Sequence, residues 1–185
     1  PGYIAFRTGA DNETYTLPIK YDFKIQVIGN RNRVIIEETV IPDDLIIEIV
    51  SGSNNLVRTS QTAIGDDFIY RGNDGNDRLT LGNGTVIADI ADIKTRGGNE
   101  NINLRDLETR DDLLLFAGDG RDVLEVELAT IGDDAIIRME GGDDIVVLDA
   151  LLVLDVADIS GNRDFDRLAI DVAGVEARKL HLREF

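Results

Sequence analysis

The chain lacks several residue types on which common protein chemistries depend. None of its 185 residues is cysteine, which excludes a disulfide framework and thiol chemistry. It has no tryptophan, only 5% aromatic residues and a single histidine, His181. We therefore expect no aromatic platform for sugar rings and no histidine-based catalysis. His181 is expected to be an outward residue of a last strand.

Positive charge and long apolar runs are also scarce. The 19 Lys and Arg are outnumbered by 36 Asp and Glu, which gives a net charge of −17. A charge of this sign disfavours nucleic acid and anionic membrane surfaces, so we expect binding to neither. No apolar stretch approaches the roughly 18 residues of a membrane span, so no membrane insertion is expected. Because the sequence begins with Pro1, without Met or a signal peptide, we expect it to be a segment of a longer protein.

What the chain does have is a repeat. Short turns rich in Gly, Asp and Asn return about every 22 residues. The last polar residue of each turn forms a first series: Asn32, Asn55, Asp77, Glu100, Asp122, Asp144 and Asp166. A second series lies half a period away: Asp22, Asp44, Asp67, Asp89, Asp112, Asp134 and Asp155. A period of this length predicts a stacked array of coils.

The segments between the turns have the period of a β-strand. After five members of the first series, apolar residues stand two and four positions further on: Leu79, Leu81, Ile102, Leu104, Leu124, Val126, Val146, Leu148, Leu168 and Ile170. This alternation predicts strands with these residues facing inward. The segments after the second series are too uniformly apolar to fix their inward face. No sustained 3.6-residue pattern occurs, so we expect almost no helix.

The sequence therefore predicts an all-β fold, a parallel β-solenoid with about 22 residues per coil and seven to eight coils. A single coil cannot bury its apolar face, but stacked coils form parallel sheets on two sides of a thin core. We expect one domain over residues 1–185. In it, residues 1–20 are an N-terminal cap or first coil, 21–170 are regular coils and 171–185 are a C-terminal cap, since an open sheet edge templates aggregation.

The Gly-rich turns resemble a known repeat. Gly72–Thr80 reads GNDGNDRLT, which is similar to the G-G-x-G-x-D-x-U-x nonapeptide of RTX, or haemolysin-type, calcium-binding proteins. Ala117–Glu125 looks like a second copy in which Ala replaces the first Gly, and the resemblance covers roughly residues 65–170. It implies a right-handed parallel β-roll with extracellular Ca²⁺ held between stacked turns by Asp carboxylates and backbone carbonyls. The coil of about 22 residues departs from the family's roughly 18.

Calcium takes six to eight hard oxygen ligands, which acidic side chains and turn carbonyls can supply. The candidate ligands are acidic residues of the Gly-rich turns: Asp74, Asp77, Glu100, Asp119, Asp122, Asp143, Asp144, Asp164 and Asp166. A metal-free alternative is that arginines in or beside these turns neutralise the carboxylates: Arg71, Arg78, Arg96, Arg121, Arg163 and Arg167. The doublets Asp111–Asp112 and Asp133–Asp134 are expected to be structural.

Two functions from different classes fit these patterns. The first is a calcium-binding structural segment of a larger bacterial protein, extracellular or on the cell surface, that serves as a spacer, an adhesin stalk or a folding aid. Its partners would be calcium, other domains of the parent chain or a cell-surface polysaccharide. The alternative is a carbohydrate-binding or polysaccharide-modifying β-helix module. The chain has no Ser-His-Asp arrangement and no distinctive acid/base cluster, so we expect no enzyme activity.

Overall fold

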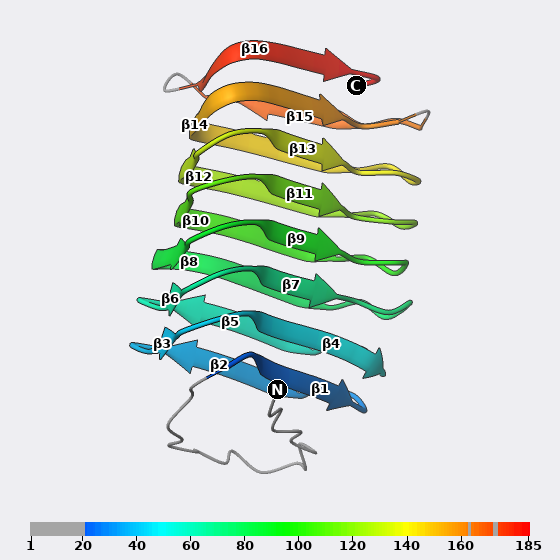
Figure 1. The fold of residues 1–185 in the computed structure, drawn as a ribbon. Coiled ribbons are helices and arrows are strands. Elements are labelled where there is room, and N and C mark those ends of the chain that lie inside the picture. Colours follow the sequence, from blue (N-terminus) through cyan, green and yellow to red (C-terminus); the bar gives the residue numbers. More distant parts are fainter. Residues whose placement is uncertain (1–20, 163, 172–173) are drawn as a thin grey trace.

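The computed structural model describes residues 21–162, 164–171 and 174–185, and in these residues the chain winds into a stack of coils (Figure 1). The strands are β1 (Phe23–Ile28), β2 (Arg33–Glu37), β3 (Val40–Ile41), β4 (Leu45–Ser51), β5 (Leu56–Ser60), β6 (Ala63–Ile64), β7 (Phe68–Arg71), β8 (Arg78–Ile87), β9 (Ala91–Lys94), β10 (Asn101–Thr109), β11 (Leu113–Phe116), β12 (Val123–Ile131), β13 (Ala135–Arg138), β14 (Ile145–Ser160), β15 (Arg167–Ile170) and β16 (Val175–Arg183). These residues contain no helix, and hence none long and apolar enough to span a membrane. The prediction of a parallel β-solenoid with about 22 residues per coil is confirmed, with about seven turns.

Each strand pairs in parallel with the equivalent strand of the next coil. The strands after the Gly-rich turns stack in the order β2, β5, β8, β10, β12 and β14, with β15 beyond them. Those after the second series stack in the order β1, β4, β7, β9, β11, β13 and β14. In the first part of these strands equivalent residues lie opposite one another, as Ile102 lies opposite Leu79 on one side and opposite Leu124 on the other. The register between β10 and β8 shifts further on, between Arg105 and Leu107.

The core is a column of apolar side chains between the stacked strands. Eight of the ten residues predicted to face inward, from Leu79 to Leu148, are at most 2% exposed. Leu168 and Ile170 hold the same register positions on β15. Leu168 is half-buried and Ile170 is 43% exposed, because β15 pairs only with β14 among the described strands. The strands after the second series bury alternate residues as well, such as Leu113 and Leu115 on β11.

The coils also contain a third strand segment, whereas the sequence predicts strands on only two sides of the core. It is separate in the early coils, as β3 and β6, which pair with each other in parallel. In later coils it is the second half of a long strand, since β6 pairs with the end of β8. The long strands bend at a non-glycine residue in the left-handed region, with φ of 47° at Asn83, 51° at Asp106, 56° at Leu128 and 52° at Ala150. In β8 the two glycines that flank Asn83 also have positive φ. Apolar residues beyond this corner, such as Ile87 and Ile131, close the core from a third side.

The C-terminal segment continues the stack. Residues 171–185 include β16, which runs parallel to β14 and is the outermost strand in Figure 1. Arg178 and Arg183 of β16 approach Asp155 and Asp158 of β14 at 3.5 and 3.3 Å. His181 is an exposed residue of this strand. The predicted role of 171–185 as a cap stays a prediction, and the predicted cap at 1–20 lies outside the described residues.

Candidate metal sites

The Gly-rich turns stack the first series into one column, here called the Gly-turn ladder: Asn32, Asn55, Asp77, Glu100, Asp122, Asp144 and Asp166. At most steps, the main-chain N–H of one member donates to Oδ1 of the member in the next coil. The N···O distance is 2.8 Å from Glu100 to Asp122, 2.7 Å from Asp122 to Asp144 and 2.9 Å from Asp144 to Asp166. Glycine permits the close stacking, because a Cβ at Gly120 (φ 145°) would lie 1.5 Å from the carbonyl oxygen of Gly98.

The carboxylates of this ladder are buried and only half satisfied. The exposed fraction is 6% for Asp77, 4% for Glu100, 0% for Asp122 and 1% for Asp144. Oδ2 of Asp77, Asp122 and Asp144 and both side-chain oxygens of Glu100 are buried without a hydrogen bond of normal geometry. A buried carboxylate without a partner is costly as an anion, so these groups favour a proton or a cation.

The pKa values follow from this burial. Burial and the neighbouring charge of Asp122 raise the pKa of Glu100 to about 9. Burial likewise raises the pKa of Asp122 to about 6 and that of Asp144 to about 7, although each accepts a main-chain hydrogen bond that acts in the opposite direction. Burial also raises the pKa of Asp77. A pKa in this range favours the protonated form of Glu100 at neutral pH.

Arginine does not neutralise the predicted ligands among the described residues. Arg71 forms its ion pair with Asp92, on the strands after the second series. Arg78, Arg96, Arg121 and Arg167 form no ion pair in the described part of the chain. Arg163 lies outside it. The metal-free alternative in which arginines compensate these carboxylates therefore has no contact to support it in residues 21–162, 164–171 and 174–185.

The remaining predicted ligands lie on the outer part of the same turns. Asp74, Asp119, Asp143 and Asp164 are all exposed. Asp164 accepts a hydrogen bond from the main-chain N–H of Gly142 (3.1 Å), and Asp143 accepts one from that of Phe165 (3.2 Å). In the described residues, none of the nine predicted ligands belongs to a group of three acidic side chains with oxygens within 4.8 Å of one another. That they bind calcium stays a prediction.

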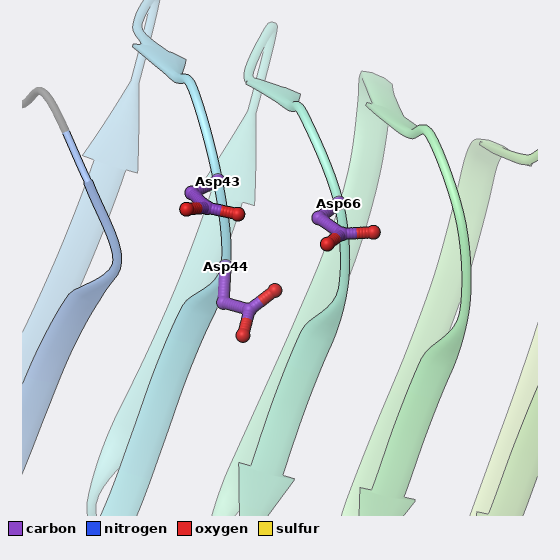
Figure 2. Close-up of side chains that lie close together, drawn as sticks. All are labelled: Asp43, Asp44 and Asp66. Atoms are coloured by element: carbon purple, nitrogen blue, oxygen red, sulfur yellow. The ribbon is translucent and has the colours of Figure 1, made fainter. Parts of the chain in front are cut away.

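Such groups occur instead at the turns of the second series. Four groups each bring together three oxygens, one per side chain, within 4.8 Å: Asp43, Asp44 and Asp66; Asp66, Asp67 and Asp89; Asp111, Asp112 and Asp133; Asp133, Asp134 and Asp155. Figure 2 shows the first group, in which Asp43 and Asp66 hold equivalent places on adjacent coils. We call this column the doublet ladder, because most of its coils carry two consecutive aspartates.

The two aspartates of a doublet have different surroundings. The second accepts a main-chain hydrogen bond from the next coil, as Asp44 does from Asp67 at 3.1 Å and Asp112 from Asp134 at 3.0 Å. The first is more open to solvent, and Asp66 and Asp133 are exposed. The pKa of Asp133 is raised by partial desolvation of its carboxylate and then by the charges of Asp134 and Asp112. The carboxylates thus crowd one another, and a cation would relieve their repulsion.

Sequence reasoning misses these groups. It treats Asp111–Asp112 and Asp133–Asp134 as structural, because any two stacked coils place acidic side chains about 5 Å apart, whether or not they have a function. The signal that is present is the return of an Asp-Asp pair at one phase of the repeat, at 43–44, 66–67, 111–112 and 133–134. The groups contain only carboxylates, a donor set that suits hard cations such as Ca²⁺ or Mg²⁺.

Comparisons with models of protein families, with curated proteins and with solved structures gave no significant match. The chain is a parallel β-solenoid with stacked groups of aspartates whose oxygens lie close enough together that they could hold a metal ion. Functional inference therefore starts from these groups.

Proposed function

We propose that this chain is a calcium-binding, RTX-like structural segment of a larger bacterial protein that is secreted or displayed on the cell surface. In this proposal Ca²⁺ binds the doublet ladder and ties neighbouring coils together. The observation that supports it is the recurrence of four all-aspartate groups, each with carboxylates from two adjacent coils.

Calcium suits these groups better than the other common divalent ions. Zinc and copper favour nitrogen or sulfur ligands, and the four groups offer only carboxylate oxygen. Magnesium demands near-ideal octahedral geometry, whereas calcium accepts six to eight oxygens in flexible arrangements that exposed aspartates, carbonyls and water can supply. Sites that are this open bind weakly, at roughly 10⁻⁴ to 10⁻³ M, which matches extracellular rather than cytosolic calcium.

A role as spacer, stalk or folding aid follows from what such an ion would do. A cation held between two coils binds the folded stack and not the unfolded chain. At ten times the dissociation constant each site would add about 1.4 kcal/mol to the free energy of unfolding. Calcium outside the cell would therefore favour the folded rod after export.

The test is a calcium titration of the wild-type chain and of a set of variants, with isothermal calorimetry and thermal melting as readouts. Asp66→Asn and Asp133→Asn each remove a carboxylate that two groups share. We expect each variant to lose about half of the bound calcium and the double variant to lose nearly all of it. Asp122→Asn, in the Gly-turn ladder, is the matched control and should keep the wild-type stoichiometry.

Two results would contradict the proposal. Identical melting curves in calcium and in chelator, without calorimetric binding, would remove calcium as a ligand. Loss of binding in Asp122→Asn but not in the double variant would place the ion at the Gly-rich turns, as the sequence alone predicts.

A further inference from the structure

The corner of β8 contains one residue more than the corner of its neighbour β10. Between the last paired position before the bend and the first one after it, β8 contains Asn83 and Gly84, whereas β10 contains only Asp106. The registers of β8 with β5 and with β6 also pass over Asn83 and Gly84. Both residues are exposed and have positive φ, 47° and 83°. They therefore form a small bulge outside the regular pairing of the stack.

The side-chain amide of Asn83 is not held in place. It forms no hydrogen bond with any described residue. The asparagines of the Gly-rich turns differ, since Oδ1 of Asn76 accepts the main-chain N–H of Asn99 and Oδ1 of Asn99 accepts that of Arg121, each at 2.8 Å. Those contacts fix the side chain toward the adjacent coil. The amide of Asn83 is instead free to rotate toward the main chain that follows it.

The main chain at Gly84 has room for such an approach. Apart from its chain neighbours, the nearest atom to a Cβ built at Gly84 would be Cγ of Gln61, 3.9 Å away. Two glycines that follow an aspartate in the Gly-rich turns, Gly75 and Gly120, are much more confined, because the same Cβ would lie 2.1 and 1.5 Å from a backbone oxygen of the neighbouring coil. Asn83–Gly84 is also the only Asn-Gly sequence in the chain.

We infer that Asn83 is a site of spontaneous deamidation. The main-chain nitrogen of Gly84 loses its proton to hydroxide and attacks Cγ of Asn83, the bond from Cγ to the side-chain nitrogen breaks, and ammonia leaves. The product is a five-membered succinimide ring. Water then adds to one of the two ring carbonyls and opens the ring to aspartate or isoaspartate at position 83. Glycine favours the attack, because it has no side chain to hinder the nitrogen and it reaches backbone conformations that other residues avoid.

The modification changes the corner in two ways. It consumes one water and releases one ammonia, so it is irreversible and accumulates with the age of the molecule. It places a carboxylate at position 83, opposite Asp106 of the next coil, where the two like charges repel. Isoaspartate also lengthens the main chain at the bend. The reaction needs only water, and it does not depend on the proposed calcium sites.

The experiment is incubation of the intact, folded chain in calcium-containing buffer at 37 °C and at pH 6, 7.4 and 8.5, followed by tryptic digestion and mass spectrometry. Trypsin releases residues 79–94, which contain Asn83, and residues 97–105, which contain Asn99. We expect the peptide 79–94 to gain about 1 Da and to separate into aspartate and isoaspartate forms, faster at higher pH. It should react at least about ten times faster than the peptide 97–105, because only Asn83 precedes an open glycine.

Asn83→Gln is the matched variant, since attack on glutamine would form a less favourable six-membered ring. Gln61 has the left-handed φ of 47° at its own corner, so glutamine is compatible with this backbone. The variant should show no mass gain in residues 79–94 and should melt as the wild type does.

Three results would overturn the inference. The first is an unchanged peptide 79–94 from the folded chain under conditions in which a synthetic peptide of the same sequence deamidates, because the fold would then protect Asn83. The second is an equal rate in the peptides 79–94 and 97–105. The third is an equal mass gain of residues 79–94 in the wild type and in Asn83→Gln, which would place the change at another residue.

Discussion

The main-chain N–H of Glu100 donates a hydrogen bond to Oδ1 of Asp122, 2.8 Å away in the next coil, and Oδ2 of Asp122 stays buried without a partner. The same step recurs from Asp122 to Asp144 and from Asp144 to Asp166. One oxygen of each carboxylate thus satisfies the backbone of its neighbour, while the other adds to a column of unpartnered acceptors. Because these carboxyl groups have raised pKa values, we expect the stability of the fold to depend on pH.

In the absence of calcium, the free energy of unfolding should decrease as the pH rises. The pKa of Glu100 is about 9 in the folded chain against an ordinary value of 4.5, so the folded state binds this proton more tightly than the unfolded state does. Its stabilising contribution is complete below about pH 4.5 and is lost as the pH approaches 9. Asp144, with a pKa of about 7, acts in the same direction at lower pH. We therefore expect the melting temperature in chelator to be lower at pH 9 than at pH 6.

Glu100→Gln isolates this effect. Glutamine keeps the size of the side chain but does not ionise, so the variant should lose less stability than the wild type between pH 6 and pH 9. Glu125→Gln is the control, since Glu125 is exposed in the neighbouring coil. Equal pH dependence in the wild type and in Glu100→Gln would show that Glu100 does not carry the effect.

Truncation of a stacked core residue should be costly. Leu104 is fully buried, with Leu81 and Val126 at the same register position on the adjacent coils. Leu104→Ala should lower the free energy of unfolding by about 2–5 kcal/mol, because it removes apolar contacts and leaves a cavity. Ile35→Ala, at a position that is 45% exposed on β2, should cost about 1 kcal/mol or less. Chemical denaturation measures both, and similar losses would contradict the assigned inward face.

Substitution by alanine should have very different effects at two glycines of the Gly-rich turns, Gly120 and Gly97. Gly120 has φ of 145°, and an added Cβ would meet the backbone oxygen of Gly98 at 1.5 Å. The nearest atom to a Cβ at Gly97 would be 3.4 Å away, and its φ lies outside the left-handed region. Gly120→Ala should therefore destabilise the fold by well over about 1 kcal/mol. Gly97→Ala should change the melting temperature little, and a comparable loss in both variants would count against the tight stacking of these turns.

Removal of the last strand should cause association. Truncation after Asp171 deletes β16, which covers part of β14 in parallel pairing. Ala157 and Ile159, both fully buried in the intact chain, would then lie at an open edge that can pair with another chain. Size-exclusion chromatography should show oligomers of the truncated chain, whereas deletion of only the last two residues should not change the elution. If the truncated chain is monomeric, β16 is not needed to protect the edge of β14 from association.

The regular part of the fold could be predicted from local patterns, whereas the candidate sites could not. Ile102 stands two positions after Glu100, and that spacing alone suffices to place it inward, where it is 1% exposed. The same spacing predicts that the residues of the Gly-turn ladder stack in a column, but it does not predict which atoms they contact. This reasoning does not identify Asp66 and Asp133 as candidate metal ligands. A pair of aspartates in a turn has the same local sequence pattern whether it binds a metal or only shapes the turn.

The sequence by itself determined the period, the strands and the inward face, because turn chemistry and the two-residue alternation of a strand are local properties. Only the tertiary structure decided which oxygens meet. Asp66 belongs to two groups because its coil lies between those of Asp44 and Asp89, residues 22 and 23 positions away. The corner at Leu128 and the unpartnered oxygens of Glu100 likewise arise from the register between coils. That register is set by the packing of the whole stack, which no single repeat contains.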